Sequence, residues 1–393
     1  MGITSAQTSM VLTGRLRVLR DAGFRVTLLT SPGELAESVA RSEGVEIATV
    51  PMQRRIAPLA DLISFVRIYR VLRRLKPDMV EFSTPKAGLL GMSASWLLNV
   101  PRRVYLLRGL RLERTHGVMR WVLLQAERIC AACADAVVCN SVSLRCEAED
   151  LGIGAPGKLK VLGSGSSRGV DTERFAPGAS DVRFQYGIQP SIPVIGFVGR
   201  LTRDKGLPEL LVAFHGILKV HPDAYLMLVG WFDESEDAID AVMRKRIETH
   251  PRILCTGYVS DPAPYYRAMD VFVLPSWREG FPNAVLEAAA TGVPAITTLS
   301  TGARDAVVPE VTGLLVPPGY PEAIREAVVR LLNSRQERKR MGAAARTWVQ
   351  EHFADSYILN LTVAFYLGLL GIGQSSGPIN GPQAAMDSVP ASR

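Results

Sequence analysis

The chain has 393 residues, of which 47% are hydrophobic and 21% are charged, a balance typical of a globular protein and not of a disordered one. This length exceeds one ordinary hydrophobic core, so we expect two domains. The net charge of +7 is uneven: residues 1–170 hold 24 Lys and Arg against 14 Asp and Glu, and the remainder is slightly acidic. The basic half should face an anionic partner, but it lacks the aromatic interleaving and the reading helix of a nucleic-acid-binding protein, so no nucleic acid is expected.

The cysteines predict a reducing, cytoplasmic compartment. The five fit no disulfide framework, and Cys130 and Cys133 lie in an apolar helical run with no histidine at ligand spacing. We therefore expect buried free thiols. No cleavable signal peptide is visible at the N-terminus. The apolar run 357–373 contains Asn360 and Thr362 and is short for a membrane span, so it is predicted to be a packing helix.

The N-terminal half alternates between helices and strands. Helices are predicted from Met10 to about Gly23 and over 59–75, 89–99 and 119–134, and strands over 25–29, 45–50, 78–82, 103–107 and 136–140. Such alternation is typical of a parallel, doubly wound sheet. The strand that should precede the first helix is missing, because residues 1–5 are too short and too polar to form it. Either the start codon is misplaced or this sheet is one strand short.

The alternation stops in a stretch rich in Gly, Ser and Pro over 152–190 and then starts again. The fold predicted is α/β, with two doubly wound Rossmann-like domains that face a ligand-binding cleft. The predicted division is an N-terminal domain over residues 1–165 and a C-terminal domain over 166–355. A C-terminal helix over 356–372 is predicted to pack back toward the N-terminal domain, and a disordered tail follows over 373–393.

One segment of the second half combines a phosphate site with two carboxylates. An apolar strand over 270–274 runs into a loop that contains Glu279, and a helix that begins near Asn283 contains Glu287. The start of a helix attracts phosphate, and Gly280 lets the backbone come close to a ligand. A carboxylate near phosphate is unfavourable unless it binds hydroxyl groups, so two of them predict a ligand with hydroxyls at both ends, such as a nucleotide sugar. The alternatives for a single Glu are a helix cap or a solvated helix face.

A second loop carries two cations. Arg200 and Lys205 follow a predicted strand, with Gly199 before them and Gly206 after them. Two cations at a strand end suit a diphosphate, both in binding and in stabilising it as a leaving group. Two surface cations on an ordinary loop are the alternative.

The Glu279-x7-Glu287 spacing, within Pro275-Ser276-x-x-Glu279-Gly280-Phe281-Pro282-Asn283, resembles the paired-glutamate motif of the retaining family 4 glycosyltransferases, which have the GT-B fold. The linker from Gly163 to Phe175 is similar to that of members that build capsule, exopolysaccharide or lipopolysaccharide chains. The resemblance implies that Glu279, Arg200 and Lys205 are catalytic. The donor-binding residues it implies are Gly199, Arg200, Lys205, Val259, Glu279, Gly280, Phe281, Pro282, Asn283, Val285 and Glu287. On the acceptor side it implies Lys86, Arg108 and Gly109, although many members have a His where this chain has Arg108.

The predicted activity is transfer of a sugar, with retention, from a nucleoside diphosphate sugar, expected to be a UDP-sugar, to a glycan or lipid-linked acceptor in bacterial surface polysaccharide biosynthesis. No Asp-x-Asp pair lies at a strand end, so we expect no metal and no other cofactor; the acidic stretch 233–237 is interpreted as a solvated loop. The alternatives are a nucleotide-sugar-binding protein without turnover and a nucleotide-sugar epimerase on the same fold. The basic residues of 54–76 predict peripheral attachment to an anionic membrane at its cytoplasmic face.

Overall fold

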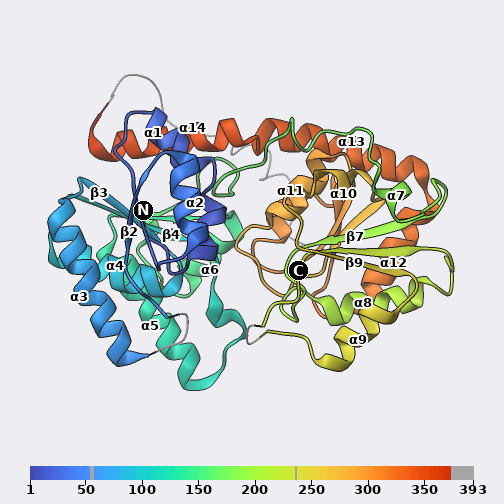
Figure 1. The fold of residues 1–393 in the computed structure, drawn as a ribbon, viewed down its shortest axis with the longest axis horizontal. Coiled ribbons are helices and arrows are strands. Elements are labelled where there is room, and N and C mark those ends of the chain that lie inside the picture. Colours follow the sequence, from blue (N-terminus) through green and yellow to red (C-terminus); the bar gives the residue numbers. More distant parts are fainter. Residues whose placement is uncertain (54–56, 235–236, 373–393) are drawn as a thin grey trace. The chain divides into compact units, whose positions relative to one another are not determined.

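The computed structural model describes residues 1–53, 57–234 and 237–372, which fall into two compact units (Figure 1). The N-terminal unit combines residues 1–168 with the chain from Tyr357 onward, and the C-terminal unit comprises Gly169–Ser356. The chain therefore passes from one unit to the other twice. The predicted disordered tail, 373–393, lies outside the described residues.

The C-terminal unit is built on a six-stranded parallel sheet with the order β12-β11-β10-β7-β8-β9. Most of these short apolar strands are buried on both faces, as expected of a parallel sheet covered by helices. The strands are β7 (Val194–Val198), β8 (Tyr225–Val229), β9 (Ile253–Gly257), β10 (Val271–Leu274), β11 (Ala295–Thr298) and β12 (Gly313–Val316). The strand order reverses between β7 and β10, which makes this the topological switch point of the sheet.

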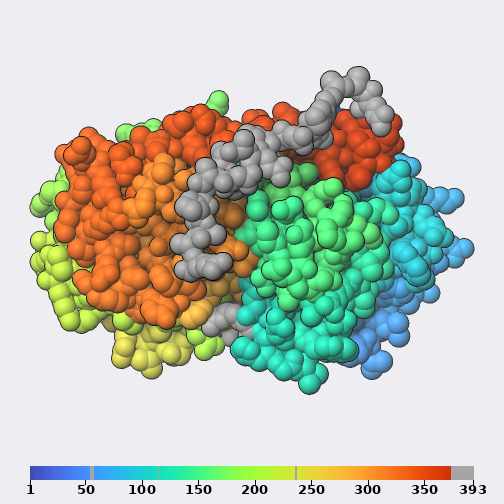
Figure 2. Space-filling view, turned by 180° about the vertical axis from the view of Figure 1, so that it is seen from behind, coloured from blue at the N-terminus to red at the C-terminus, as the bar shows by residue number. Residues whose placement is uncertain are grey.

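Helices cover the sheet of the C-terminal unit. They are α7 (Val182–Gln185), α8 (Leu207–Ile217), α9 (Ala241–Thr249), α10 (Ala263–Arg267), α11 (Asn283–Ala290), the short 3-10 helix η4 (Arg304–Ala306), α12 (Pro321–Asn333) and α13 (Arg335–His352). Helix α8 packs against α12, and α11 packs against α13. In the view from behind, the orange-red residues of α13 form much of the surface of this unit (Figure 2).

The sheet of the N-terminal unit is divided. Strands β1 (Thr27–Thr30) and β2 (Glu46–Thr49) form one parallel pair, and β3 (Met79–Ser83), β4 (Arg102–Leu107), β5 (Ala136–Cys139) and β6 (Leu159–Lys160) form a second parallel sheet. Gly2 lies between them and forms parallel bridges to Leu29 and Phe82. Residues 1–3 thus occupy the place of the strand that the sequence lacks, without forming a full strand.

The helices of the N-terminal unit include counterparts of those predicted over 59–75, 89–99, 119–134 and 356–372, together with shorter helices that were not predicted. They are η1 (Ala6–Leu12), α1 (Arg15–Asp21), α2 (Glu34–Glu43), α3 (Pro58–Leu75), α4 (Pro85–Leu97), η2 (Arg111–Arg114), α5 (Gly117–Cys133), α6 (Val142–Asp150), η3 (Pro156–Lys158) and α14 (Asp355–Leu370). The single helix predicted from Met10 onward is wrong. A 3-10 turn comes first, and Gly14 at φ 81° separates it from α1, because this left-handed conformation interrupts a helix.

A buried polar cluster ties the last helix to the N-terminal unit. The guanidinium of Arg15 in α1 donates two hydrogen bonds to the Glu81 carboxylate in β3, at 3.0 and 2.6 Å. It also donates to the Tyr366 hydroxyl of α14 at 2.6 Å, and that hydroxyl donates to Glu81. A buried ion pair needs such additional hydrogen bonds to offset its loss of water. None of the described helices is both long and apolar enough to cross a membrane.

Candidate active site

The switch point of the C-terminal unit brings the two predicted loops together. Strands β7 and β10 are paired in parallel, with Val271 opposite Ile195, so their carboxyl ends lie side by side. Arg200 and Lys205 follow the first strand, and Glu279 follows the second. In open α/β sheets, ligands bind in the crevice at the carboxyl ends of the strands where the order reverses. The fold therefore places this cluster at the expected position of a ligand site.

Lys205 and Glu279 are in direct contact although 74 residues separate them. The Nζ of Lys205 lies 2.5 Å from Oε1 of Glu279, and the Ser276 hydroxyl donates to the same oxygen at 2.7 Å. Their side chains are only 18% and 11% exposed. The ammonium and the carboxylate thus compensate each other at a poorly solvated position, where an unpaired charge would be costly.

Arg200 is held by an aspartate that the sequence analysis misinterpreted. Its Nη1 donates to Oδ2 of Asp233 at 2.5 Å. Burial opposes the charge of Arg200, but the hydrogen bond to Asp233 and the neighbouring carboxylates outweigh it, so its pKa is raised. The prediction of a solvated loop over 233–237 is wrong for Asp233, whose side chain is only 17% exposed. Asp237 is 39% exposed and lies 3.5 Å from Arg278, and residues 235–236 lie outside the described residues.

A buried aspartate balances the cations. Asp204 is 3% exposed, accepts a hydrogen bond from the Thr202 hydroxyl at 2.6 Å, and lies 3.6 Å from Arg278. Burial alone would raise its pKa. The Thr202 hydrogen bond and the charges of Lys205, Arg200 and Arg278 have a larger, opposite effect, so the pKa is lowered overall. Asp204 is therefore ionised at neutral pH. Among the described residues, no three His, Cys, Asp or Glu side chains lie together in a way that could hold a metal ion.

Glu287 lies one turn inside α11, as predicted, and is almost buried at 8% exposure. The hydroxyl of Tyr266, in α10, donates to its Oε2 at 2.9 Å. This bond fixes the carboxylate in one orientation. No local sequence pattern identifies Tyr266, because the contact depends on how α10 packs against α11.

The loop after β11 shapes the backbone around Glu279. The Glu279 N–H donates to the carbonyl of Thr301 at 3.2 Å, and the Thr298 hydroxyl donates to the carbonyl of Ser276 at 2.6 Å. Gly302, at φ 73°, lies so close that a Cβ there would be 2.4 Å from the carbonyl oxygen of Gly280. Sequence analysis did not identify this loop, whose only signal is a cluster of Ser, Thr and Gly after a strand.

The other predicted donor residues have different surroundings. The side chains of Phe281 and Val285 lie in the hydrophobic core, at 9% and 0% exposure, so a ligand could reach only their backbone. Pro282 caps α11 and Asn283 begins it. The rest are Gly199 and Gly280, which lie in the two loops, and Val259, which is half-buried after β9.

The predicted acceptor residues follow β3 and β4 of the N-terminal unit. Lys86 is paired with Asp61 of α3, with Nζ 2.6 Å from Oδ1. The Nε and Nη2 atoms of Arg108 are buried and have no hydrogen-bond partner within the described part of the chain. Burial, assisted by the nearby Arg15, lowers the pKa of Arg108 to about 10. Gly109 follows at φ 143°. Guanidinium nitrogens with unused donors are suited to bind an anion.

Two doubly wound units, one of which carries paired glutamates and two cations at its switch point, define a glycosyltransferase of the GT-B class. Two family models match this chain: "Glycosyl transferase 4-like domain" over residues 12–165 and "Glycosyl transferases group 1" over residues 192–334.

The curated relatives assign the family. The chain is 34% identical to the capsular polysaccharide biosynthesis glycosyltransferase CapM of Staphylococcus aureus, over 91% of this chain and 93% of CapM. It is 29% identical to the UDP-Gal:alpha-D-GlcNAc-diphosphoundecaprenol alpha-1,3-galactosyltransferase of Escherichia coli, over 72% and 73% of the two chains. The chain belongs to the family 4 glycosyltransferases.

Solved structures agree with the fold. Anabaena HepE in complex with UDP-glucose has a TM-score of 0.75 at 20% identity, covering 91% of this chain and 96% of HepE. WaaG, a glycosyltransferase involved in lipopolysaccharide biosynthesis, has a TM-score of 0.70 at 14% identity, covering 93% and 99%.

Proposed function

We propose that this glycosyltransferase transfers a sugar from a UDP-sugar, with retention of anomeric configuration, to a lipid-linked or glycan acceptor in the assembly of a bacterial surface polysaccharide. The likeness to CapM supports the pathway. The Escherichia coli relative is named for a UDP-Gal donor and a diphosphoundecaprenol-linked acceptor. The similarity to it supports a UDP-sugar as the donor and a lipid-linked glycan as the acceptor. The nucleotide-sugar-binding protein without turnover and the epimerase are the competing functions.

The contact between Lys205 and Glu279 carries the proposal. In the free protein each satisfies the other's charge. A bound donor offers each of them a better partner, with diphosphate oxygens for Lys205 and Arg200 and sugar hydroxyls for Glu279. Glu287, held by Tyr266, binds the ribose hydroxyls. The ion pair thus keeps both groups oriented until the donor separates them.

The proposed reaction is a front-face displacement. The bond from the anomeric carbon to the diphosphate oxygen breaks, and the acceptor oxygen forms its bond to the same carbon on the same face. The proton of the acceptor hydroxyl passes to the departing diphosphate. Arg200 and Lys205 stabilise the charge that develops on that leaving group, a role that a metal ion fills in other enzymes, so the reaction is proposed to be metal-independent.

The test is a transfer assay with UDP-glucose, UDP-galactose, UDP-GlcNAc and GDP-mannose, an acceptor fraction from bacterial membranes, and excess EDTA. We expect release of UDP that depends on the acceptor, and a product whose anomeric configuration by NMR matches that of the donor. Tight binding with no release of nucleotide would favour the binding protein. Conversion of the donor into its epimer would favour the epimerase.

Helix α3 supports the proposed attachment to the membrane. Arg67, Arg70, Arg73, Arg74 and Lys76 are all exposed. Leu59, Leu62 and Ile63 near the start of the helix are 81%, 61% and 54% exposed. Exposed apolar residues beside basic ones are typical of a surface that lies on anionic lipid. Each basic residue contributes about 1 kcal/mol near such a surface, which suffices for reversible binding. Arg54 and Arg55, predicted to add to this patch, lie outside the described residues.

Co-sedimentation with liposomes tests this attachment. We expect binding to anionic but not to neutral vesicles, weakening as salt screens the charges, and loss of binding when Arg67, Arg70, Arg73 and Arg74 are changed to Glu. The matched control changes four exposed basic residues of the C-terminal unit to Glu: Lys219, Lys245, Arg335 and Lys339. Equal loss in both variants would mean that only net charge matters and that α3 has no special role.

A further inference from the structure

Four strands of the N-terminal unit end in polar side chains at one edge of its divided sheet. Thr30 is the last residue of β1 and Ser83 is the last residue of β3, and Arg108 and Asn140 directly follow β4 and β5. The four strands run in the same direction, because β3, β4 and β5 pair in parallel and Gly2 bridges β1 and β3 in parallel. Their carboxyl ends, and these four side chains, therefore lie at the same edge.

These side chains also share one face of the sheet. Side chains alternate along a strand, and residues opposite each other in a parallel pair point to the same face. Leu106 of β4 lies opposite Ser83 and two residues before Arg108. Val138 of β5 lies opposite Leu106 and two residues before Asn140. Leu106 and Val138 belong to the hydrophobic cluster that α1 and α14 help to form, so the polar side chains continue that face.

Three of the four side chains are buried and carry an oxygen atom without a partner. Thr30, Ser83 and Asn140 are 0%, 1% and 6% exposed. Thr30 Oγ1, Ser83 Oγ and Asn140 Oδ1 make no hydrogen bond within residues 1–53, 57–234 and 237–372. Leu28, two residues before Thr30, belongs to the same hydrophobic cluster, which places Thr30 on the same face. Buried polar atoms are nearly always hydrogen-bonded, so three of them on one face indicate a bound group.

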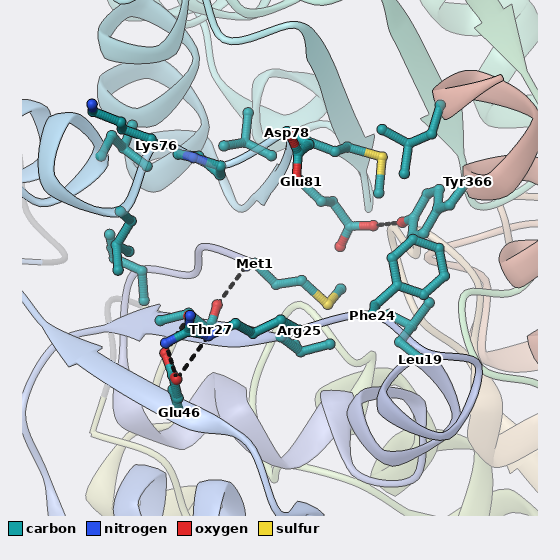
Figure 3. A pocket seen from close by; sticks show the side chains of 18 of the residues that line it. Met1, Leu19, Phe24, Arg25, Thr27, Glu46, Lys76, Asp78, Glu81 and Tyr366 are labelled. Atoms are coloured by element: carbon teal, nitrogen blue, oxygen red, sulfur yellow. Dashed lines mark hydrogen bonds and ion pairs between the residues drawn. The ribbon is translucent and has the colours of Figure 1, made fainter. Parts of the chain in front are cut away.

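Arg108 supplies the charge of this cluster. Its Nε and Nη2 atoms are buried and have no hydrogen-bond partner in the described part of the chain. Glu81, the carboxylate that acts on Arg108, is already occupied: it accepts a hydrogen bond from the Tyr366 hydroxyl (Figure 3) and two from Arg15. Arg15 and Arg168 add positive charge around Arg108. A buried cation in these surroundings favours an anion, because hydrogen bonds to the anion offset its loss of water.

Two helices begin at the same edge. Helix α4 begins at Pro85, two residues after Ser83, and α6 begins at Val142, two residues after Asn140. The amino end of a helix carries a partial positive charge that attracts anions. Both helices therefore add to the positive potential that Arg108 creates at this edge.

The cluster offers the hydrogen-bonding groups that an anionic sugar needs. Arg108 and the hydroxyls of Thr30 and Ser83 can donate to an oxyanion, and Asn140 Oδ1 can accept from a sugar hydroxyl. We propose that this cluster binds a phosphate or carboxylate group carried by the sugar of the acceptor. The inference rests on the proposed function, and it adds that the acceptor is anionic at the end that the N-terminal unit binds.

Titration calorimetry with inorganic phosphate tests the cluster without sugar transfer. Every sample is the full chain with Arg200→Ala and Lys205→Ala, so that the cations of the C-terminal unit cannot account for the binding. We expect phosphate to bind, and its affinity to fall at least about tenfold when Arg108→Gln is added, because charge-assisted hydrogen bonds are lost. The matched control adds Lys160→Gln, which removes an exposed lysine of β6, and should bind phosphate unchanged.

The melting temperature in phosphate-free buffer separates binding from a structural role. Arg108→Gln should not lower it, since the Nε and Nη2 atoms have no partner to lose among the described residues. Equal phosphate affinity in Arg108→Gln and Lys160→Gln, or no phosphate binding at all, would overturn the proposal. A fall in melting temperature with unchanged phosphate affinity would show that Arg108 is structural and would overturn it as well.

Transfer to three soluble acceptors identifies the source of the anion. They share one sugar and an octyl chain, and differ in that one is neutral, one is linked through phosphate and one carries a uronic acid carboxylate. We expect the KM of one anionic acceptor to lie at least about tenfold below that of the neutral one, and Arg108→Gln to reduce this difference. Equal KM values for all three would overturn the proposal. Absence of transfer to every acceptor, with phosphate binding that still depends on Arg108, would contradict the proposed function alone.

Discussion

Arg200 and Lys205 are each held by an acidic side chain at the switch point of the C-terminal unit. Changing either to Ala should lower kcat on the order of 10²-fold or more, since each is proposed to stabilise charge that grows as the bond to the diphosphate breaks. Steady-state kinetics with the UDP-sugar that supports transfer is the measurement.

The control for this prediction is Lys245→Ala, which removes an exposed lysine of the same unit. It should retain the wild-type rate. Lys205→Ala also leaves Glu279 without its cation, so a modest fall in melting temperature is expected. Wild-type kcat in both site variants, with unchanged melting temperatures, would refute the diphosphate role.

Substitutions of the two glutamates should affect the binding of different ligands. Glu287→Gln should weaken the binding of both the donor and the free nucleotide, by at most about 1.5–3 kcal/mol. The reason is that the proposed charge-assisted hydrogen bond to the ribose becomes a neutral one. Glu279→Gln should leave the affinity for free UDP unchanged and weaken only the binding of the intact UDP-sugar. Isothermal titration of both ligands against both variants measures this, and Tyr266→Phe, which removes the hydroxyl that orients Glu287, should resemble a milder Glu287→Gln. Equal losses for both ligands in both glutamate variants would contradict the division of roles.

The candidate site residues lie close to recognisable strands: Arg200, Lys205 and Glu279 lie in the short loops that follow two strands, and Glu287 lies in the helix after the second loop. Glu279 and Glu287 are eight residues apart, and Arg200 and Lys205 are five apart. Local spacing was therefore sufficient to name them as candidates. Asp233 and Tyr266 come from other loops and helices. Their contacts depend on strand order and helix packing, which no local pattern encodes.

Helix α5 carries a buried acid that predicts a pH dependence of stability. Glu127 is 4% exposed and accepts a hydrogen bond from the Tyr105 hydroxyl at 2.6 Å. Burial raises its pKa from 4.5 to about 7. The folded protein therefore holds a proton that the unfolded chain releases above pH 4.5, so this contribution to stability is complete below that pH and is lost as pH rises through about 7.

Glu127→Gln should remove this dependence, because Gln keeps the acceptor for Tyr105 and cannot ionise. From pH 5 to 8, the free energy of unfolding of the wild type should fall, relative to the variant, by up to about 3 kcal/mol. Chemical denaturation across this range gives the measurement. Glu37→Gln, an exposed change on α2, serves as the control and should follow the wild type. Parallel curves for Glu127→Gln and the wild type would show that Glu127 does not titrate as stated.

Helices and strands were predicted best where their patterns are long. The range 59–75 matches α3, Pro58–Leu75, because apolar residues recur at helical spacing over four turns. The start of the chain was predicted poorly, because the 3-10 turn of η1 has no comparable period. The pairing of Gly2 with two strands could not be predicted, since it depends on residues far away in the sequence.

The division of the molecule predicts that its C-terminal unit is self-sufficient. Gly169–Ser356 contains one continuous hydrophobic cluster together with Arg200, Lys205, Glu279 and Glu287. Expressed alone, it should melt cooperatively and bind UDP with the affinity of the full chain, but transfer no sugar. Calorimetry and titration test this. A broad, non-cooperative transition would show that the unit needs the remainder of the chain.

Completion of the N-terminal unit depends on α14, which the ribosome makes after the whole C-terminal unit. At about 5–20 residues per second, roughly ten to forty seconds separate the synthesis of residue 168 from that of residue 357. During this interval Arg15 and Glu81 lack the hydroxyl of Tyr366, and the apolar side chains that α14 will cover remain accessible. Until α14 is made, the nascent chain should therefore carry an unfinished N-terminal unit, whose apolar surface a chaperone could recognise. A translational pause before the codons of α14 would prolong the exposure of this surface.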